Sequence, residues 1–482
     1  MKSRNLITVL FACLACSLTS CTEEIMSEIN RDKNHSTDVA SKLIITDVIN
    51  SLSFSITGSD LAFYASVYVE YNVGVYGQMY NAEKRIGEPS AATTYNNSWG
   101  NIYSNLLNLK AIIEKCSPGG NEEGNTVTLG IAQVLSAYAL AILTDMFGDV
   151  PCTEALQPGV IWTPKLDRQE MVYNAINQFL TDGIANLEKE SSMSLLGNQD
   201  PVYGGKPANW KKFAYGLKAR YAMRLSKVKP DYDAAIAAAG KSFANVGEEA
   251  VFKKYPTIKN PFYLFFTDRD YFGASQSLHS KLSDRNDPRD SMFFKPYPKE
   301  KKEEEILFFA PNGNPEQKQG YYGISALATP ESPVYLMSYH ELEFLQAEAY
   351  LRKGDLNSAK THLKNAVSAA FAKAGLTTAV AENYYTSRIE PKLTSATEAL
   401  KETVFQKYLG LFESEAIETY NDIRRLKAMG EGDIIRLDNS LKFPLRYSYG
   451  DGDVKTNVNV REAYGNGEYV YSENVWWAGG TR

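Results

Sequence analysis

The sequence predicts a mostly α-helical fold, in which a helical repeat scaffold carries a large irregular, loop-rich region and little β structure. Apolar residues recur with the helical period before residue 250, and a repeat-like pair of helices follows residue 336. The stretch between them is rich in proline, glycine and aromatic residues. Residues 1–20 are expected to be removed, and residues 21–482 to form a single domain.

The N-terminus has the pattern of a secretory signal peptide. Lys2 and Arg4 precede a short apolar run, and small residues follow it. The run is shorter than the roughly 20 residues that a membrane-spanning helix needs. The sequence "LTSC", which ends at Cys21, resembles a bacterial lipobox, so Cys21 is predicted to be lipidated and to anchor the chain. The alternative is a chance cysteine beside a conventional cleavage site.

Composition excludes several classes of protein. The formal net charge is −6 and no basic stripe is present, which argues against nucleic-acid binding. After Cys21 no run of 18 apolar residues is expected, so membrane contact is predicted through the lipid anchor only. In the mature chain Cys116 and Cys152 could pair, but two free thiols are favoured, and no cysteine-based zinc site remains.

Residues 36–250 are predicted to form the first part of the helical scaffold, behind a solvated tether at 22–35. Three helices in this part have one apolar face each and are followed by turn residues such as Gly148 and Pro151. The apolar faces contain Ile131, Val134, Leu135, Tyr138 and Ile142; then Val172, Ile176, Phe179, Leu180 and Leu187; then Trp210, Phe213, Leu217, Tyr221 and Leu225.

Residues 336–430 continue the scaffold with a tetratricopeptide-like helix pair. In "AEAYLRKGDLNSAKTHLKNAV", Tyr350 is followed by Ala359 at the spacing of that repeat, and Gly354-Asp355 forms the turn. Small residues such as Ala347 and Ala359 let the two helices approach closely. A generic helical hairpin is the alternative, and residues 230–243 are a weaker second candidate for the repeat.

Residues 254–335 are predicted to be an irregular binding region. Segments such as "NPFYLFFTDRDYFG" and "NPEQKQGYYG" keep no helical period, and their aromatic content disfavours disorder. Irregular backbone on a rigid helical scaffold is a common way to build a binding site.

Several phrases, in order along the chain, resemble the SusD/RagB family of outer-membrane nutrient-binding lipoproteins of Bacteroidetes. They are "TDMFGDVPCTEAL", "NDPRD", "FQKYLGLFESEAIETYNDIRRLK" and "VWWAGG". The segment "FPLRYSYGDGD" departs from the family's usual Tyr-Pro, so that loop is expected to differ. The resemblance implies that Glu23 and Glu24 belong to a surface-export signal, although a merely solvated tether is the alternative.

The same resemblance implies a lipid-anchored protein of the outer membrane, exposed at the cell surface. It would capture an oligosaccharide and deliver it to a SusC-like TonB-dependent transporter. A peptide ligand, as for RagB-like members, is the alternative. A surface glycoside hydrolase and a scaffold that binds no small ligand are further, less favoured interpretations.

No enzyme activity, cofactor or metal is predicted from the residues. "HELEF" lacks the second histidine of a zinc protease, and no nucleophile elbow or phosphate-binding loop occurs. Glu413 and Glu415 could in principle hydrolyse glycosides, and Asp451 with Asp453 could contribute to a calcium site, but helix structure and a turn explain them as well. The pair Arg424-Arg425 is interpreted as an ion-pair element.

The predicted ligand-binding residues form two clusters of aromatic and polar residues in loops. They are Tyr76, Tyr80, Arg85 and Tyr95 in the first cluster, and Tyr271, Phe272, Tyr321 and Tyr322 in the second. Trp99 is assigned to the core, because it begins a helix. We expect the two loops to meet on one face and to hold the ligand there by stacking and hydrogen bonds.

Overall fold

The computed structural model describes residues 39–90, 94–253, 258–297 and 306–481. All elements below belong to the compact unit Ser41–Arg482. The predicted signal peptide, lipidated Cys21, the pair Glu23 and Glu24, and the tether at 22–35 lie outside the described residues. The single domain at 21–482 stays a prediction.

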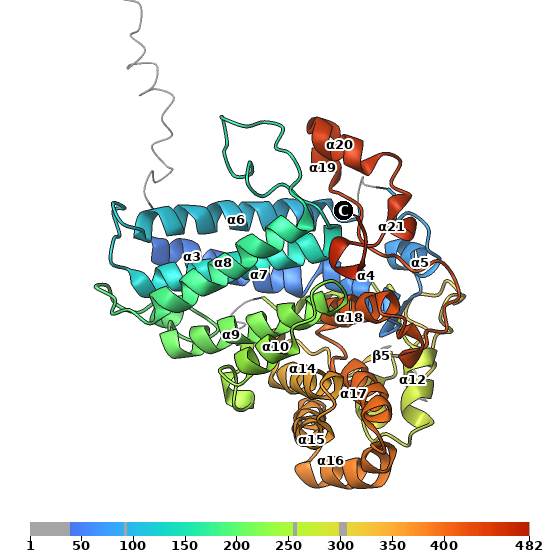
Figure 1. Ribbon diagram of the computed structural model, residues 1–482. Helices are drawn as coiled ribbons and strands as arrows, with labels where there is room; N and C mark the ends of the chain where they lie inside the picture. Colours follow the sequence, from blue (N-terminus) through green and yellow to red (C-terminus); the bar gives the residue numbers. More distant parts are fainter. Residues whose placement is uncertain (1–38, 91–93, 254–257, 298–305, 482) are drawn as a thin grey trace, which may run out of the picture. The chain divides into compact units, whose positions relative to one another are not determined.

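The predicted mostly α-helical fold is confirmed (Figure 1). The helices of the N-terminal half are α3 (Ser41–Ser51), η1 (Leu52–Thr57), α4 (Asp60–Tyr68), α5 (Gly77–Glu83), α6 (Asn96–Cys116), α7 (Thr126–Phe147), α8 (Gln169–Leu187), η2 (Gly197–Gln199), α9 (Pro207–Arg224), η3 (Leu225–Lys227), α10 (Tyr232–Ala239) and η4 (Val246–Glu248).

Further helices follow in the C-terminal half. They are α11 (Pro261–Asp268), α12 (Gln276–Ser283), α13 (Asp290–Phe293), α14 (Tyr339–Arg352), α15 (Leu356–Lys373), α16 (Thr378–Tyr384), η5 (Tyr385–Ile389), η6 (Glu390–Lys392), α17 (Ala396–Gly410), α18 (Ala416–Ala428), η7 (Gly432–Ile434), α19 (Asp451–Thr456), α20 (Val458–Tyr464), α21 (Tyr469–Ser472) and η8 (Trp476–Ala478).

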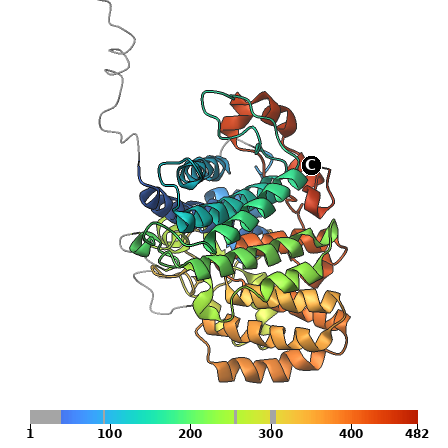
Figure 2. The same cartoon turned by 60° about the vertical axis from the view of Figure 1, so that its left-hand side comes forward.

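The long helices pack in succession, each on the next. The order of packing is α6, α7, α8, α9, α10, α14, α15 and α16, and Figure 2 shows this series of layers. Helix α7 is long and apolar enough to span a membrane, so the expectation that no such run follows Cys21 is wrong. However, 94% of the most apolar 18-residue window of α7 is buried within the protein. We therefore interpret α7 as the central core helix of this series.

The tetratricopeptide-like helix pair is formed by α14 and α15. Ser338 and Asp355 cap the two helices with their side chains, which accept hydrogen bonds from Glu341 N and Ser358 N. Ala347 and Ala359 are 0% and 2% exposed, and both belong to the apolar cluster between the helices. The small side chains allow the close approach that the spacing of the sequence predicts.

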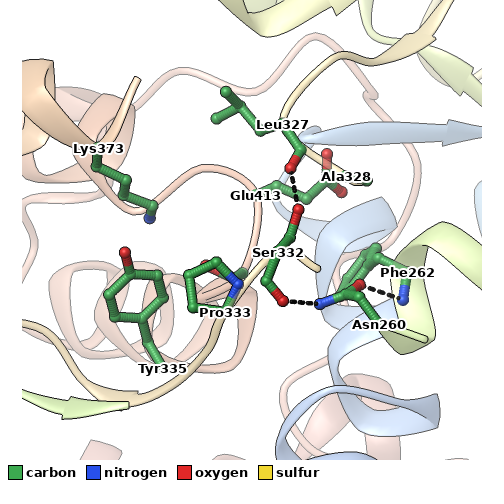
Figure 3. A pocket seen from close by; sticks show the side chains of 10 residues that line it. Asn260, Phe262, Leu327, Ala328, Ser332, Pro333, Tyr335, Lys373 and Glu413 are labelled. Carbon is green, nitrogen blue, oxygen red and sulfur yellow. Dashed lines mark hydrogen bonds between the residues drawn. The ribbon is translucent and has the colours of Figure 1, made fainter. Parts of the chain in front are cut away.

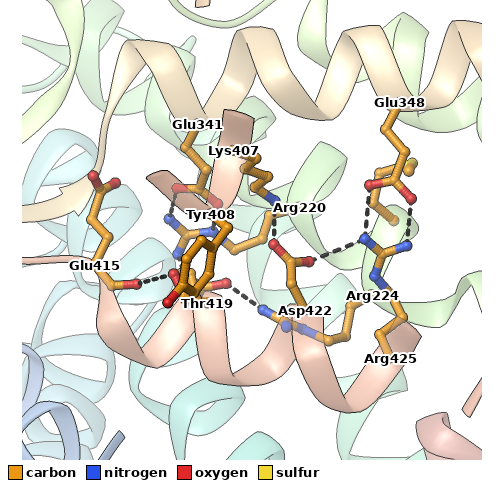
Figure 4. Close-up of polar contacts among 12 residues, drawn as sticks. Arg220, Arg224, Glu341, Glu348, Lys407, Tyr408, Glu415, Thr419, Asp422 and Arg425 are labelled. Carbon is orange, nitrogen blue, oxygen red and sulfur yellow. Dashed lines mark hydrogen bonds and ion pairs between the residues drawn. The ribbon is translucent and has the colours of Figure 1, made fainter. Parts of the chain in front are cut away.

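A buried ion-pair network joins α9, α14, α17 and α18 (Figure 4). Arg425 on α18 makes two hydrogen bonds of 2.7 Å with Glu348 on α14, and Asp422 lies 2.7 Å from Lys407 on α17. Arg220 on α9 lies 2.6 Å from Glu341 on α14. Both arginines of the predicted Arg424-Arg425 ion-pair element are 1% exposed. Arg425 forms ion pairs with Glu348 and Asp422, whereas Arg424 donates to the carbonyl oxygens of Leu445 and Asp145, so the ion-pair interpretation holds for Arg425.

Within the described ranges the strands form three separate two-stranded antiparallel sheets. They are β1 (Asn72–Gly74) with β3 (Phe272–Ala274), β2 (Ala250–Phe252) with β6 (Val334–Met337), and β4 (Phe294–Lys295) with β5 (Ile324–Ser325). In the first sheet Val73 pairs with Gly273. The pairing joins segments that are about 200 residues apart in sequence, so it brings Tyr76 of the first predicted cluster beside Tyr271 of the second.

The irregular region at 254–335 contains more helix than the sequence predicts. Helices α11 and α12 have 8 residues each, too few to produce a persistent apolar period. Local capping defines them instead: Asn260 accepts hydrogen bonds from the N–H groups of Phe262 and Tyr263, and Ser275 accepts one from Leu278. Much of the remaining described part is loop.

Candidate functional site

The β1–β3 pairing places Tyr76 and Tyr271 side by side. Val75 N donates to Tyr271 O at 2.8 Å, and the ring centroids of Tyr76 and Tyr271 are 5.6 Å apart. Gly77, with φ of 53°, makes this approach possible, because a Cβ there would overlap the Tyr271 ring. Tyr76 is 38% exposed and Tyr271 is half-buried, so this aromatic pair is open to a ligand.

The other predicted tyrosines of the second cluster are loop residues that pack against the β1–β3 sheet. Tyr321 is half-buried and stacks on Phe308, with ring centroids 4.9 Å apart, while Lys318 Nζ lies 4.6 Å from the Tyr321 centroid. Tyr322 is 5% exposed and packs with Val73 and Val75. The ring of Tyr321 is therefore already covered by its neighbours, and that of Tyr322 is part of the packing beneath the sheet.

Three predicted ligand-binding residues are buried, which does not favour ligand contact by their rings. Tyr95 is 1% exposed and stacks on Tyr447 with centroids 4.1 Å apart. Phe272 is 2% exposed and packs among other phenylalanine rings. The third buried residue is Tyr322, which is 5% exposed. These rings pack into the apolar core from a strand, a helix N-cap and a loop, and β3 is buried at all three of its residues.

Arg85 and Tyr80 lie on or just after α5. Arg85 has φ of 55°, and its guanidinium stands 4.9 Å from the ring centroid of Tyr68 and donates to Ala82 O at 2.5 Å. Tyr80 is half-buried. Arg85 thus makes contacts within the protein, although both residues border the same short helix as the open aromatic pair.

A polar cleft of about 380 Å³ lies next to α5 and combines residues from α4, α5, α6 and the loop between α5 and α6. Its described lining residues are Asp60, Tyr64, Gln78, Asn81, Ala82, Ile86, Gly87, Glu88, Ser90, Thr94 and Asn97. Most of the lining side chains can donate or accept hydrogen bonds. The cleft and the open aromatic pair both border α5, which contributes Gln78 and Asn81 to the cleft and begins directly after Tyr76 of the pair.

Two carboxyl groups face this cleft. Burial raises the pKa of Asp60. Burial also raises the pKa of Glu88. Hydrogen bonds from the hydroxyls of Tyr471 at 2.6 Å and Tyr68 at 3.2 Å lower this pKa and offset part of the effect of burial. Glu88 is therefore fixed in position by the protein, whereas no described residue donates a hydrogen bond to the carboxyl group of Asp60.

Sequence reasoning missed the lining residues Asp60, Gln78, Asn81 and Asn97. The spacing of Gln78 and Asn81 puts both amides on one face of a short helix, which is a weak signal that could have been found. Asp60 and Asn97 belong to different helices, so nothing local in the sequence connects them to α5.

A smaller cavity of about 90 Å³, lined by both apolar and polar residues, lies where α11, β6 and the α17–α18 connection meet (Figure 3). Asn260 Nδ2 donates to Ser332 O at 2.9 Å, and Lys373 Nζ lies 5.0 Å from the ring centroid of Tyr335. Glu413 lines this cavity, and burial raises its pKa to about 7. Its volume is about a quarter of that of the cleft, so it suits water or one small group.

The two carboxyl groups considered for hydrolysis are both engaged within the protein. Glu413 accepts a hydrogen bond from Asn72 Nδ2. Glu415 contacts His340 Nε2 at 2.9 Å and Lys373 Nζ at 3.1 Å; burial opposes its ionised form, but these neighbours hold its pKa well below its usual range. Both glutamates are 4% exposed and neither lines the polar cleft.

Other predicted candidates also have structural contacts. Asp453 accepts a hydrogen bond from Trp99 Nε1, and Trp99 is 3% exposed, as its assignment to the core predicts. Asp451 pairs with Lys455 at 2.6 Å. Within the described residues no group of three or more His, Cys, Asp or Glu is placed to hold a metal ion.

Cys116 and Cys152 are free thiols, as favoured from the sequence. Burial raises the pKa of both Cys116 and Cys152 to about 11. Cys152 lines an apolar hollow of about 440 Å³ between α6, α7 and α8, which is separate in its lining from the polar cleft. Thiols with so high a pKa are protonated near neutral pH and react slowly.

Comparison with known proteins places the chain in a family. Residues 33–450 match the family model SusD-like, described as starch-binding associating with outer membrane. A SusD/RagB family protein from Bacteroides thetaiotaomicron is 43% identical, with a TM-score of 0.84, over 92% of this chain and 100% of that one. No curated protein matches the chain in sequence.

Two more distant structures share the fold. A SusD homolog from Bacteroides uniformis is 22% identical, with a TM-score of 0.72, over 92% of this chain and 100% of that one. A chitin-binding SusD homolog from Flavobacterium johnsoniae is 19% identical, with a TM-score of 0.72, over 91% and 98% of the two chains. The family match along most of the chain, with the 43% identical structure, identifies this protein as a member of the SusD/RagB family.

Proposed function

We propose that this protein is a lipid-anchored nutrient-binding protein of the outer membrane that captures an oligosaccharide at the cell surface and delivers it to a SusC-like TonB-dependent transporter. The family, described as starch-binding and associated with the outer membrane, supports carbohydrate binding. The observation that carries the proposal is that a polar cleft and an open aromatic pair both border the short helix α5.

This combination suits a sugar. The apolar faces of sugar rings stack on aromatic side chains, and their hydroxyls exchange hydrogen bonds with amides, carboxylates and hydroxyls. Tyr76 and Tyr271 supply the first kind of contact, and Gln78, Asn81 and Asn97 supply the second. The chitin-binding protein with the same fold is consistent with a glycan ligand on this scaffold.

The proposal is tested by measuring glycan binding to the mature chain, residues 21–482, on a glycan array and then by calorimetry. Tyr76→Ala should weaken binding by roughly 0.5–1.5 kcal/mol, the contribution of one aromatic contact beyond area burial. The matched control is Trp162→Ala, because Trp162 is 81% exposed and does not line the polar cleft.

Unchanged affinity in Tyr76→Ala would refute the assignment of this aromatic pair to the ligand. A large loss of thermal stability in that variant would show instead that Tyr76 acts in packing. Binding of peptides in place of glycans would favour the RagB-like alternative, and hydrolysis of a bound glycan by the wild type would favour an enzyme.

Delivery to a transporter is tested separately. The protein and the SusC-like protein of the same cell should copurify from solubilised outer membranes, and deletion of the transporter should abolish uptake without abolishing surface binding of the glycan. Uptake that persists without the transporter would contradict this part of the proposal.

A further inference from the structure

We infer that the polar cleft selects its ligand by charge: it accepts uncharged and amino-bearing glycans and rejects glycans that carry uronate or sulfate groups. The inference rests on the proposed function and deepens it by naming the class of sugar. It is carried by the composition of the cleft and by which of its side chains lack partners.

The described lining of the cleft contains two acidic residues, Asp60 and Glu88, and neither lysine nor arginine. Recognition of a carboxylate or sulfate normally uses arginine or lysine, which supply positive charge and several N–H donors. A glycan anion in this cleft would lose water and meet negative charge in return. That balance disfavours binding of an acidic sugar.

The polar groups that remain available are suited to hydroxyls and to amino groups. Within the described part of the chain, the side chains of Asp60, Gln78, Asn81 and Asn97 make no hydrogen bond or ion pair with another residue. The three amides can each donate and accept, and the Asp60 carboxylate accepts up to four hydrogen bonds. Hydroxyls can satisfy all of these groups, and an ammonium group can pair with Asp60.

Arg85 offsets part of the charge of Glu88, but it does not line the cleft, and burial is the cause of the raised pKa of Asp60. The Arg85 guanidinium is held by the Ala82 carbonyl and stands over the Tyr68 ring. Asp60 is on α4, half-buried, and has no described cationic partner.

Position adds to the effect of charge. Asp60 begins α4, and Tyr64 lies one turn later and also lines the cleft. Glu88 is 3% exposed at the cleft wall and is fixed by two tyrosine hydroxyls. The negative charge is therefore held at the walls of the cleft rather than on mobile surface side chains, so screening by salt reduces it less than at an open surface.

The experiment measures binding of three charge classes of oligosaccharide of equal length at low ionic strength. The probes are neutral glycans with several backbones, deacetylated chito-oligosaccharides, and acidic glycans such as oligogalacturonides and sulfated oligosaccharides. The wild type should bind members of the neutral or amino-bearing class, and the acidic class should bind at least tenfold more weakly.

Asp60→Asn tests the residue, because it removes one charge and keeps the shape of the side chain. The ratio of acidic to neutral affinity should rise at least threefold in this variant. The matched control is Asp47→Asn, which makes the same change in net charge at an exposed position on α3 that does not line the cleft. The ratio should not change in the control.

The outcomes separate the two claims. Acidic glycans that bind as tightly as neutral ones, or an Asp60→Asn ratio equal to that of the control, would overturn the inference and leave the proposed function intact. Binding of no glycan class, with binding of peptides instead, would overturn the proposed function and the inference with it.

Discussion

Replacing Glu348 by glutamine should destabilise the protein strongly, because this one carboxylate neutralises two buried arginines. Glu348 is 1% exposed and accepts two hydrogen bonds of 2.7 Å from Arg425 and one of 2.8 Å from Arg352. Burial opposes its charge, but the two arginines outweigh burial and hold the pKa of Glu348 well below its usual range. Glutamine keeps the volume and removes the charge.

The size of the stability loss depends on the ion pairs that the two arginines keep in the variant. Breaking a buried ion pair by removing one partner costs about 3–5 kcal/mol, since it leaves a buried charge without compensation. Arg425 would keep Asp422 at 3.1 Å, and Arg352 would keep Glu431 at 2.7 Å. The loss should therefore lie at the lower end, at about 3 kcal/mol.

Chemical denaturation at pH 7, followed by circular dichroism, measures this change. The matched control is Glu382→Gln, which breaks the pair of Glu382 with Lys364, whose side chains are 59% and 50% exposed. An exposed pair contributes about 0–1 kcal/mol, so the control should change little. Equal stability of the two variants would refute the reasoning that the buried ion pairs of Figure 4 stabilise the protein.

The same variant has a predicted pH dependence. The pKa of Glu348 is lower in the folded protein than its ordinary value of 4.5, so the folded state gains stability from the ionised group above that value. This contribution is lost as the pH falls from there toward the folded pKa. The difference in stability between wild type and Glu348→Gln should therefore shrink below about pH 4.5. A difference that stays constant down to about pH 3 would contradict the assignment.

Ala359→Trp should overpack the α14–α15 interface and destabilise by about 1–3 kcal/mol or more, whereas an unchanged thermal melt would place residue 359 at the surface. Gly148→Ala should destabilise by about 1–3 kcal/mol, because Gly148 has φ of 84° and a Cβ there would overlap the Arg446 guanidinium; a neutral melt would contradict this. Cys21→Ala should release the protein from the membrane fraction, and retention as firm as in the wild type would refute lipidation. Replacing Glu23 and Glu24 by alanine should leave the protein anchored but reduce its protease accessibility on whole cells, and unchanged accessibility would refute the export signal.

Helical parts of the fold could be predicted because their signals are local. The apolar residues of α7 predict a helix, and the small residues Ala347 and Ala359 predict a close helix contact, although α7 is buried on all sides and not on one face alone. Capped helices of 8 residues, such as α11 and α12, were not predicted, since side-chain capping is decided within one turn and leaves no periodic pattern.

The candidate site could be predicted only in part. Tyr76 and Tyr271 were predicted by their place beside turn residues, and the β1–β3 pairing does bring them together. The sequence could not distinguish these open rings from the buried rings of Tyr95 and Phe272, because all four occur in similar loop-like contexts.

The sequence by itself determined the helical class, the repeat-like pair and the resemblance to the family, since each depends on residues that are close together along the chain. Tertiary structure alone decided which aromatic rings face outward and that Asp60, Gln78 and Asn97 share one cleft. The reason is physical: a polar side chain that lines a cleft does not belong to an apolar packing face, so it adds nothing to the apolar periodicity of the sequence. Its neighbours come from α4, α5 and α6, whose positions are set by the packing of the whole core.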